Sequence, residues 1–95
     1  MAAYVIGDVE VIDSAAYDEY RSRVPATVAA YGGRYLARGG AVVAVEGGWS
    51  PSRCVILEFP SMAQLKTWYT SPEYTPLQAI RARATKSKMI FTEGI

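Results

Sequence analysis

Ninety-five residues, of which 51% are hydrophobic and 12% aromatic, correspond to one small domain whose core is marginal in isolation, so assembly of copies is favoured. Ten basic and nine acidic residues leave a formal charge of +1, which excludes the strong positive field of a protein that binds nucleic acid or an anionic membrane. One cysteine and no histidine exclude an internal disulfide and a zinc site of the usual kind.

Residues 1–12 lack the basic region and long apolar run of a signal peptide, and no stretch reaches the roughly 20 apolar residues of a membrane helix. We therefore expect a cytoplasmic protein that forms one domain over residues 1–95 and binds neither nucleic acid nor membrane. Because histidine is absent, we also expect no metal and no other cofactor.

Residues 4–12 alternate in polarity and predict a strand, with Val5 and Val9 on one face. Asp8 and Glu10 lie on the opposite face, two residues apart, where paired carboxylates could do acid–base work. We favour a simpler interpretation, in which they lie at the exposed end of the strand or in an interface, because two acids in a strand first need partners.

A helix is predicted to begin at Asp13 or Ser14, since either side chain can cap the first backbone N–H groups. One apolar face runs along about four turns. Its residues are Tyr17, Tyr20, Val24, Val28 and Tyr31. Pro25 removes one helical hydrogen bond and should kink or restart the helix. Gly32-Gly33 should end it, with one glycine in the left-handed conformation.

Residues 34–38 predict a short strand on which Arg34 and Arg38 share a face. Gly39-Gly40 follows, and it forms either a two-residue hairpin or a bend within one long strand. Residues 41–46 predict strand again.

After a loop over residues 47–53, residues 54–59 predict a further strand. Glu58 is a carboxylate in this otherwise apolar segment. If it is buried it needs a cation, and Arg34 or Arg38 is the obvious candidate.

Ser61 and Gln64 have the spacing of a capping box and predict a helix with an apolar face that includes Trp68 and Tyr69. Ser71-Pro72 and Thr75-Pro76 each have the pattern of a helix start. A second stripe, Leu77, Ile80 and Ala84, predicts a short helix, and residues 87–93 predict the last strand. The basic residues Arg81, Arg83, Lys86 and Lys88 are interpreted as a solvated face.

This order is the ferredoxin-like β-α-β-β-α-β pattern of the α+β class, with helices on one face of an antiparallel sheet. The other sheet face would be bare in a monomer and would expose an apolar patch. We therefore expect a homodimer in which two sheets pack face to face.

Five segments follow one another along nearly the whole chain: GDVEV, VPATVAAYGGRYLARGG, VEGGW, VILEFPS and WYTSPEY. With these segments the sequence resembles the domain of unknown function 1330 family, within the dimeric α+β barrel superfamily. The resemblance implies a ferredoxin-like subunit, a barrel made by two facing sheets, and a strand bend at Gly39-Gly40. It implies no activity.

No catalytic, metal or phosphate-binding motif is present, so the candidate site is a pocket between the sheet and the helices. Its proposed residues are Arg38, Glu58, Trp68, Tyr69 and Tyr74, with Tyr17 and Trp49 as further walls. Arg38 would fix a carboxylate or enolate oxygen, and Glu58 or Tyr74 would carry a proton. In the alternative interpretation, which we weight more heavily, the aromatic residues are core and Arg38 and Glu58 form a structural ion pair.

Two functions remain open from the sequence. One is binding of a small organic metabolite, with cofactor-independent enzyme activity suggested only by analogy with the superfamily. The alternative is a noncatalytic dimeric module with a structural or protein-interaction role.

Overall fold

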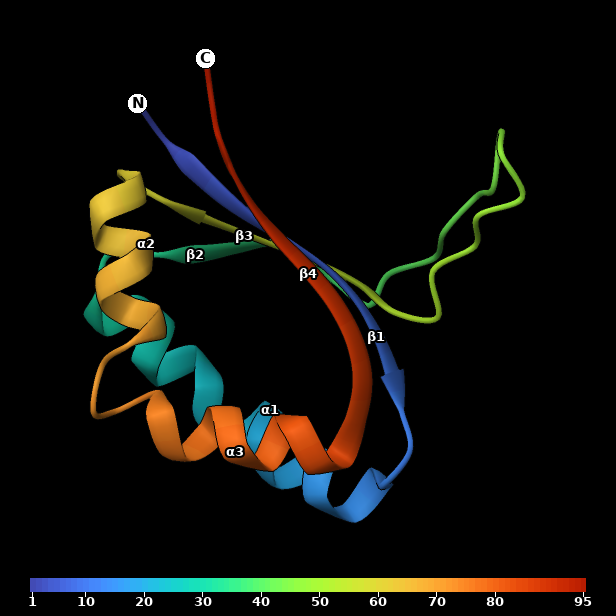
Figure 1. Cartoon of the computed structure of the whole chain (residues 1–95), viewed down its shortest axis with the longest axis horizontal. Coiled ribbons are helices and arrows are strands. Elements are labelled where there is room, and N and C mark those ends of the chain that lie inside the picture. Colours follow the sequence, from blue (N-terminus) through green and yellow to red (C-terminus); the bar gives the residue numbers. More distant parts are fainter.

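The computed structural model describes residues 1–95, in which three helices cover one face of a four-stranded sheet (Figure 1). In chain order the elements are β1 (Ala3–Val11), α1 (Ser14–Ala30), β2 (Arg34–Arg38), β3 (Cys54–Phe59), α2 (Met62–Tyr69), α3 (Thr75–Ala84) and β4 (Thr85–Glu93). The strand order is β2-β3-β1-β4, and every neighbouring pair is antiparallel. The predicted ferredoxin-like α+β fold is confirmed.

The alternation of β1 decides which face of the sheet meets the helices. Val5 and Val9 are buried on the helix side, whereas Ile6 and Asp8 are half-buried on the other side. The core lies between the sheet and the helices. Its main cluster consists of Ala3, Val5, Val24, Val28, Leu57, Phe59, Leu65, Trp68, Tyr74, Leu77 and Ile80. None of the helices has the length and apolar character needed to cross a membrane.

Both ends of α1 are closed as the sequence predicts. Of the two candidate caps the structure uses Asp13, whose Oδ1 accepts a hydrogen bond from the Ala16 N–H at 3.1 Å. Gly32 has a φ of +79°, and the Gly33 N–H donates to the Val28 carbonyl at 2.9 Å. This is the Schellman arrangement, which turns the chain sharply out of the helix and into β2.

Helix α1 continues through Pro25 without a restart. Proline has no N–H, so the carbonyl of Arg21, four residues earlier, lacks its helical donor. The guanidinium of Arg38 on β2 donates to that carbonyl instead. Tertiary structure therefore replaces the hydrogen bond that the proline removes.

A β-bulge at Leu36 separates the two arginines of β2. Arg34 pairs with Glu58, but the register shifts between Tyr35 and Ala37, and Arg38 pairs with Val55. The extra residue turns the strand over. Arg34 therefore lies on the bare sheet face and Arg38 on the helix face, so the prediction that they share a face is wrong.

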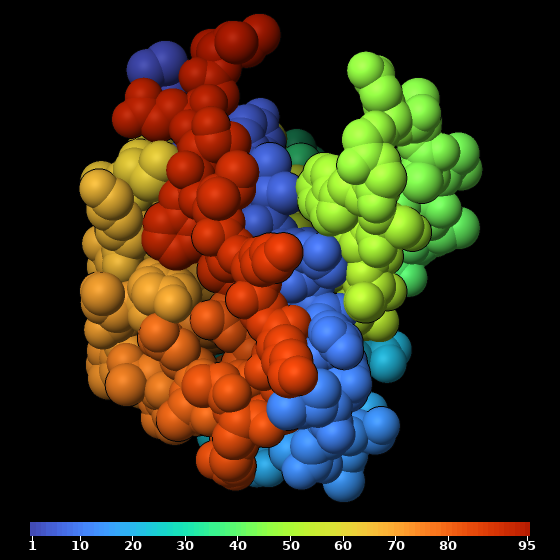
Figure 2. All heavy atoms as spheres, turned by 45° about the vertical axis from the view of Figure 1, so that its right-hand side comes forward, coloured from blue at the N-terminus to red at the C-terminus, as the bar shows by residue number.

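Residues 41–46 do not form a strand, contrary to the prediction. We call residues 40–52 the arm; none of them makes a backbone–backbone hydrogen bond. The arm stands out from the body of the molecule, away from the helices (Figures 1 and 2). Neither a two-residue hairpin nor a bend into a second strand occurs at Gly39-Gly40. The segment has strand-forming residues but no neighbouring strand to pair with, and strand formation depends on that context.

Candidate functional site

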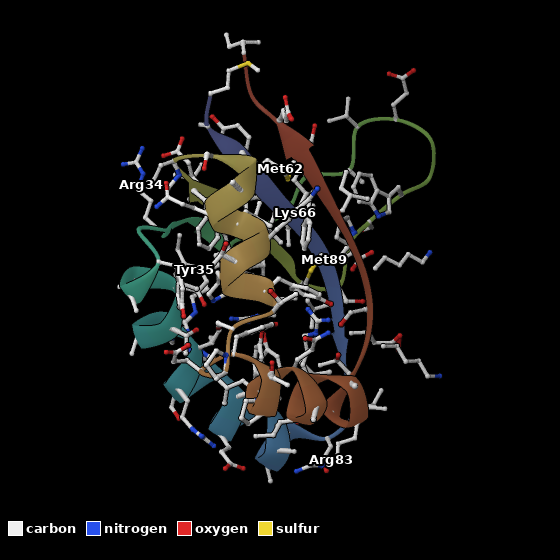
Figure 3. All side chains as sticks on the ribbon, turned by 60° about the vertical axis from the view of Figure 1, so that its left-hand side comes forward. Arg34, Tyr35, Met62, Lys66, Arg83 and Met89 are labelled. Atoms are coloured by element: carbon white, nitrogen blue, oxygen red, sulfur yellow. The ribbon has the colours of Figure 1, made fainter.

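A cavity of about 30 Å³ lies between the sheet and the helices, and each of the seven helices and strands contributes to its wall. Val5, Val24 and Leu57 are among its apolar lining residues. The polar ones are Tyr17, Tyr20, Tyr35, Arg21, Arg38 and Arg81. Figure 3 shows Tyr35 and Met89 on the inner side of the sheet. The space is enough for about one or two water molecules, or for one small polar group.

The charges around the cavity are all of one sign. Arg21, Arg38 and Arg81 line it, and no Asp or Glu does. The two ion pairs of the chain are Arg23–Glu19 and Arg34–Glu58, so none of the three lining guanidinium groups has a carboxylate within 4.0 Å. The chain as a whole has a net charge of only +1, which makes this local excess specific to the cavity.

Arg81 is the half-buried member of this set. Its Nη1 donates to the Met89 sulfur at 3.4 Å, which is a weak acceptor. Burial, the largest single influence, would lower the pKa of Arg81, but the neighbouring oxygens of Tyr74, Tyr20 and Tyr69 together raise it by more, so the pKa lies above its usual value. The cavity therefore contains a permanent cation that has no carboxylate within 4.0 Å.

Two tyrosine hydroxyls lie beside Arg81. The Tyr20 and Tyr74 oxygens are 3.0 Å apart and share one hydrogen bond. Burial raises the pKa of both phenols, and burial raises the pKa of Tyr35 to about 12. At neutral pH all three are protonated, so they can donate hydrogen bonds but cannot act as bases.

The structure brings five of the seven predicted residues to this region. Tyr17, Arg38 and Trp68 line the cavity. Tyr74 is fully buried, and its ring packs at a tilt against that of Trp68 with the centroids 4.2 Å apart. The Tyr69 hydroxyl accepts a hydrogen bond from Gln78 at 2.8 Å, and its ring lies 5.7 Å from that of Tyr74.

Two predicted residues lie elsewhere. Glu58 is on the bare sheet face, where its carboxylate accepts from Arg34 Nε at 2.7 Å. Trp49 is 61% exposed on the arm and donates to Asp8 at 3.3 Å. The prediction that Arg38 and Glu58 form an ion pair or share a pocket is wrong, because the bulge at Leu36 places them on opposite faces.

Sequence reasoning missed Arg81 as a site residue. The interpretation as a solvated face is wrong for this residue, although it holds for the exposed Arg83, which points outward from α3 (Figure 3). The spacing of the residues in α3 could have identified Arg81. Arg81 follows Leu77 by four residues and precedes Ala84 by three, so it belongs to the apolar stripe of its helix.

The sequence matches the family model described as Domain of unknown function (DUF1330) over residues 2–95. The chain belongs to this family. No curated protein matches the sequence of this DUF1330 chain.

Solved structures share the fold of this DUF1330 chain at low identity. A protein of unknown function from Rhodopseudomonas palustris, RPA0582, has 17% identity and a TM-score of 0.76, and the match covers 99% of this chain and 82% of that one. SnoaB, a cofactor-independent oxygenase from Streptomyces nogalater, has 9% identity and a TM-score of 0.66, covering 99% and 93%. A putative antibiotic biosynthesis monooxygenase from Nitrosomonas europaea has 13% identity and a TM-score of 0.64, covering 100% and 99%. At these identities the likeness establishes the α+β fold of the DUF1330 chain and no activity.

Proposed function

We propose that this protein is a cytoplasmic homodimer that binds a small organic anion between the sheet and the helices of each subunit. The observation that supports this is the cavity with three guanidinium groups and no carboxylate. A buried or half-buried cation normally has an anionic partner. Arg81 has none within the chain, so a carboxylate or enolate from outside is the complementary group.

The phenols supply a second element of recognition. Tyr20 and Tyr74 have two hydroxyl protons and use one of them in their mutual hydrogen bond. The remaining proton is available to a ligand oxygen that sits on Arg81. A carboxylate would thus receive charge-assisted bonds from the guanidinium and one neutral bond from a phenol.

The size of the cavity limits which part of the ligand enters. About 30 Å³ accepts a carboxylate group but not an aromatic ring. Arg21 and Arg38 also line an open cleft of about 420 Å³ on the outside of α1, together with Asp18, Ser22 and Pro25. We place the charged head of the ligand in the cavity and its body in this cleft, with Arg38 moving to connect the two spaces.

A cofactor-independent oxygenase is a weaker candidate, suggested by the fold shared with SnoaB. Such an enzyme would need a base to deprotonate its substrate. The raised pKa values of Tyr20, Tyr35 and Tyr74 make these phenols hydrogen-bond donors and not bases. Binding is therefore better supported than turnover. The noncatalytic structural module stays as the alternative if no ligand binds.

The test is a melting-shift screen with small carboxylic acids, each paired with its primary amide of the same shape. We expect acids and not amides to raise the melting temperature, and the Arg81→Gln variant to lose the shift. Arg83→Gln is the matched control, since it removes the same charge from the exposed face of the same helix. Hits are then assayed for oxygen consumption and product formation.

Equal shifts for acids and amides, or shifts that survive in Arg81→Gln, would contradict the proposal. Folding of each variant is checked by its far-UV circular dichroism and its ligand-free melting temperature. No shift with any compound would favour the noncatalytic module.

A further inference from the structure

Gly7 lies in the middle of β1, on the face of the sheet that meets the helices. It is buried, and side chains alternate along the strand, so a side chain here would point into the cavity, between those of Val5 and Val9. A glycine inside a strand weakens it, because it has no side chain to pack and loses more conformational freedom on folding than any other residue. A glycine at the centre of the sheet therefore needs a reason.

The backbone of β1 does not require this glycine. Gly7 does not have a positive φ. It lies opposite Val55 of β3 and Met89 of β4 in a continuous register, so there is no bulge at this position. If a Cβ atom were added to Gly7, the nearest atom beyond its two chain neighbours would be the Val55 carbonyl oxygen at 3.8 Å, which is ordinary van der Waals contact. An alanine would fit, so neither backbone conformation nor close packing explains the glycine.

The missing side chain of Gly7 leaves a well in the sheet side of the cavity. The walls of this well are Val5 and Val9 along β1, and Val55 and Met89 on the two neighbouring strands. Residues two apart on a strand are separated by about 6–7 Å, and neighbouring strands by about 4.8 Å. The well is therefore about as wide as one side chain.

A cation lies beside one wall of the well. The Nη1 atom of Arg81 donates to the sulfur of Met89 at 3.4 Å, and Arg81 lines the same cavity. The other three walls are valines, and no Asp or Glu lines the cavity. A carboxylate in the well would therefore lie beside a guanidinium group and would meet no competing acid.

We propose that Gly7 determines the specificity of the binding site. The well over Gly7 receives the carboxylate of the ligand and admits only acids that are unbranched at the carbon next to the carboxylate. A flat carboxylate with one methylene has the width of a single side chain, whereas a branch at that carbon would collide with the valine walls, which are close-packed parts of the sheet. This inference rests on the proposed function and adds the shape of the charged end of the ligand.

Two isomeric acids test the width of the well. The anions 3-methylbutyrate and 2-methylbutyrate have the same charge and composition, and only the second is branched next to the carboxylate. We expect the wild-type protein to bind 3-methylbutyrate at least about tenfold more tightly, since one misplaced methyl group is enough for such a difference in a closed pocket. Titrations followed by nuclear magnetic resonance measure both dissociation constants.

Gly7→Ala tests the residue itself. The added methyl group should fill the well, so we expect the affinity for 3-methylbutyrate to fall at least about tenfold. The same variant should raise the melting temperature of the ligand-free protein by about 2–8 °C, because alanine fits without strain and loses less conformational freedom on folding. Loss of binding together with a gain in stability distinguishes a filled site from a damaged fold. Gly40→Ala is the matched control, since it makes the same change where a Cβ would have no atom within 4 Å, and it should leave the affinity unchanged.

The outcomes separate this inference from the proposed function. A Gly7→Ala variant that binds 3-methylbutyrate as tightly as the wild type, or whose ligand-free melting temperature falls, would overturn the inference and leave anion binding standing. Equal affinity of the wild type for the two isomers, or binding of neither, would do the same. A wild-type protein that binds no acid in the melting-shift screen would overturn both.

Discussion

The guanidinium of Arg38 completes a hydrogen bond that Pro25 removes from α1. It donates to the Arg21 carbonyl and lies 4.7 Å above the Tyr35 ring. Arg38 therefore has a structural role at the entrance of the cavity, where the sequence predicted a binding role. The structural and binding roles are compatible, because the same side chain can release the Arg21 carbonyl when a ligand enters.

A double-mutant cycle tests this structural task. Arg38→Met should lower the free energy of unfolding by about 1 kcal/mol in the wild-type background, because it leaves the Arg21 carbonyl without a protein donor. Pro25→Ala restores the helical N–H, so the same Arg38→Met change should cost less than half as much there. Urea unfolding of the four proteins gives the coupling free energy between positions 25 and 38. Equal costs in both backgrounds would show that the hydrogen bond contributes nothing.

At the scale of the elements, the end of α1 is packed directly onto the core. A Cβ atom added to Gly33 would lie 2.6 Å from the Phe59 ring and 2.8 Å from the Val28 side chain. Both neighbours are fully buried, so neither can move aside without disturbing the core. Helix termination and core packing therefore depend on the same residue.

Gly33→Ala should accordingly destabilise the fold by about 1–3 kcal/mol, the usual cost of overpacking a core. For a chain of this length that is a fall of at least about 4 °C in the melting temperature. Gly40→Ala is the control, since a Cβ there would have no atom within 4 Å. Calorimetry of the two variants should show a large change for the first and little for the second. Similar melting temperatures for both would contradict the proposed steric role.

For the molecule as a whole, the bare sheet face is the feature that most needs a partner. Ile6 on β1 pairs with Ile56 on β3 and with Ile90 on β4, which makes a row of three isoleucines across the sheet. The helices cover the opposite face. Ile90 is 60% exposed and the other two isoleucines are half-buried, and such a row on an uncovered sheet face supports the proposed packing of two sheets against each other.

Ile90→Lys should dissociate this dimer, because it puts a charge into the isoleucine row of the proposed interface. Ala79→Lys adds the same charge on the exposed surface of α3 and should leave the dimer intact. The wild-type melting temperature should rise with protein concentration, and that of Ile90→Lys should not. A concentration-independent melting temperature in the wild type, together with a monomer mass, would refute the homodimer.

Local patterns were sufficient to predict most elements of this fold. The polarity of residues 4–12, the stripe that contains Tyr17 and Val24, and the Gly32-Gly33 stop act over one or two turns or along one strand. The spacing of the apolar residues and the residues that start or end an element can be read directly from the sequence, and both are the same in the folded chain. The element order that follows from them was enough for the ferredoxin-like topology.

The site and the arm depended on contacts between distant segments. The bulge at Leu36 places Arg38 on the helix face of the sheet, whereas Glu58 lies on the bare face. No pattern in residues 34–38 predicts this bulge. Strand formation by residues 41–46 requires a neighbouring strand, and this chain does not provide one. Arg81 becomes a cavity residue only when α3 packs beside α1 and brings it to Tyr20. Register, pairing and burial arise when segments meet, so only the tertiary structure decided them.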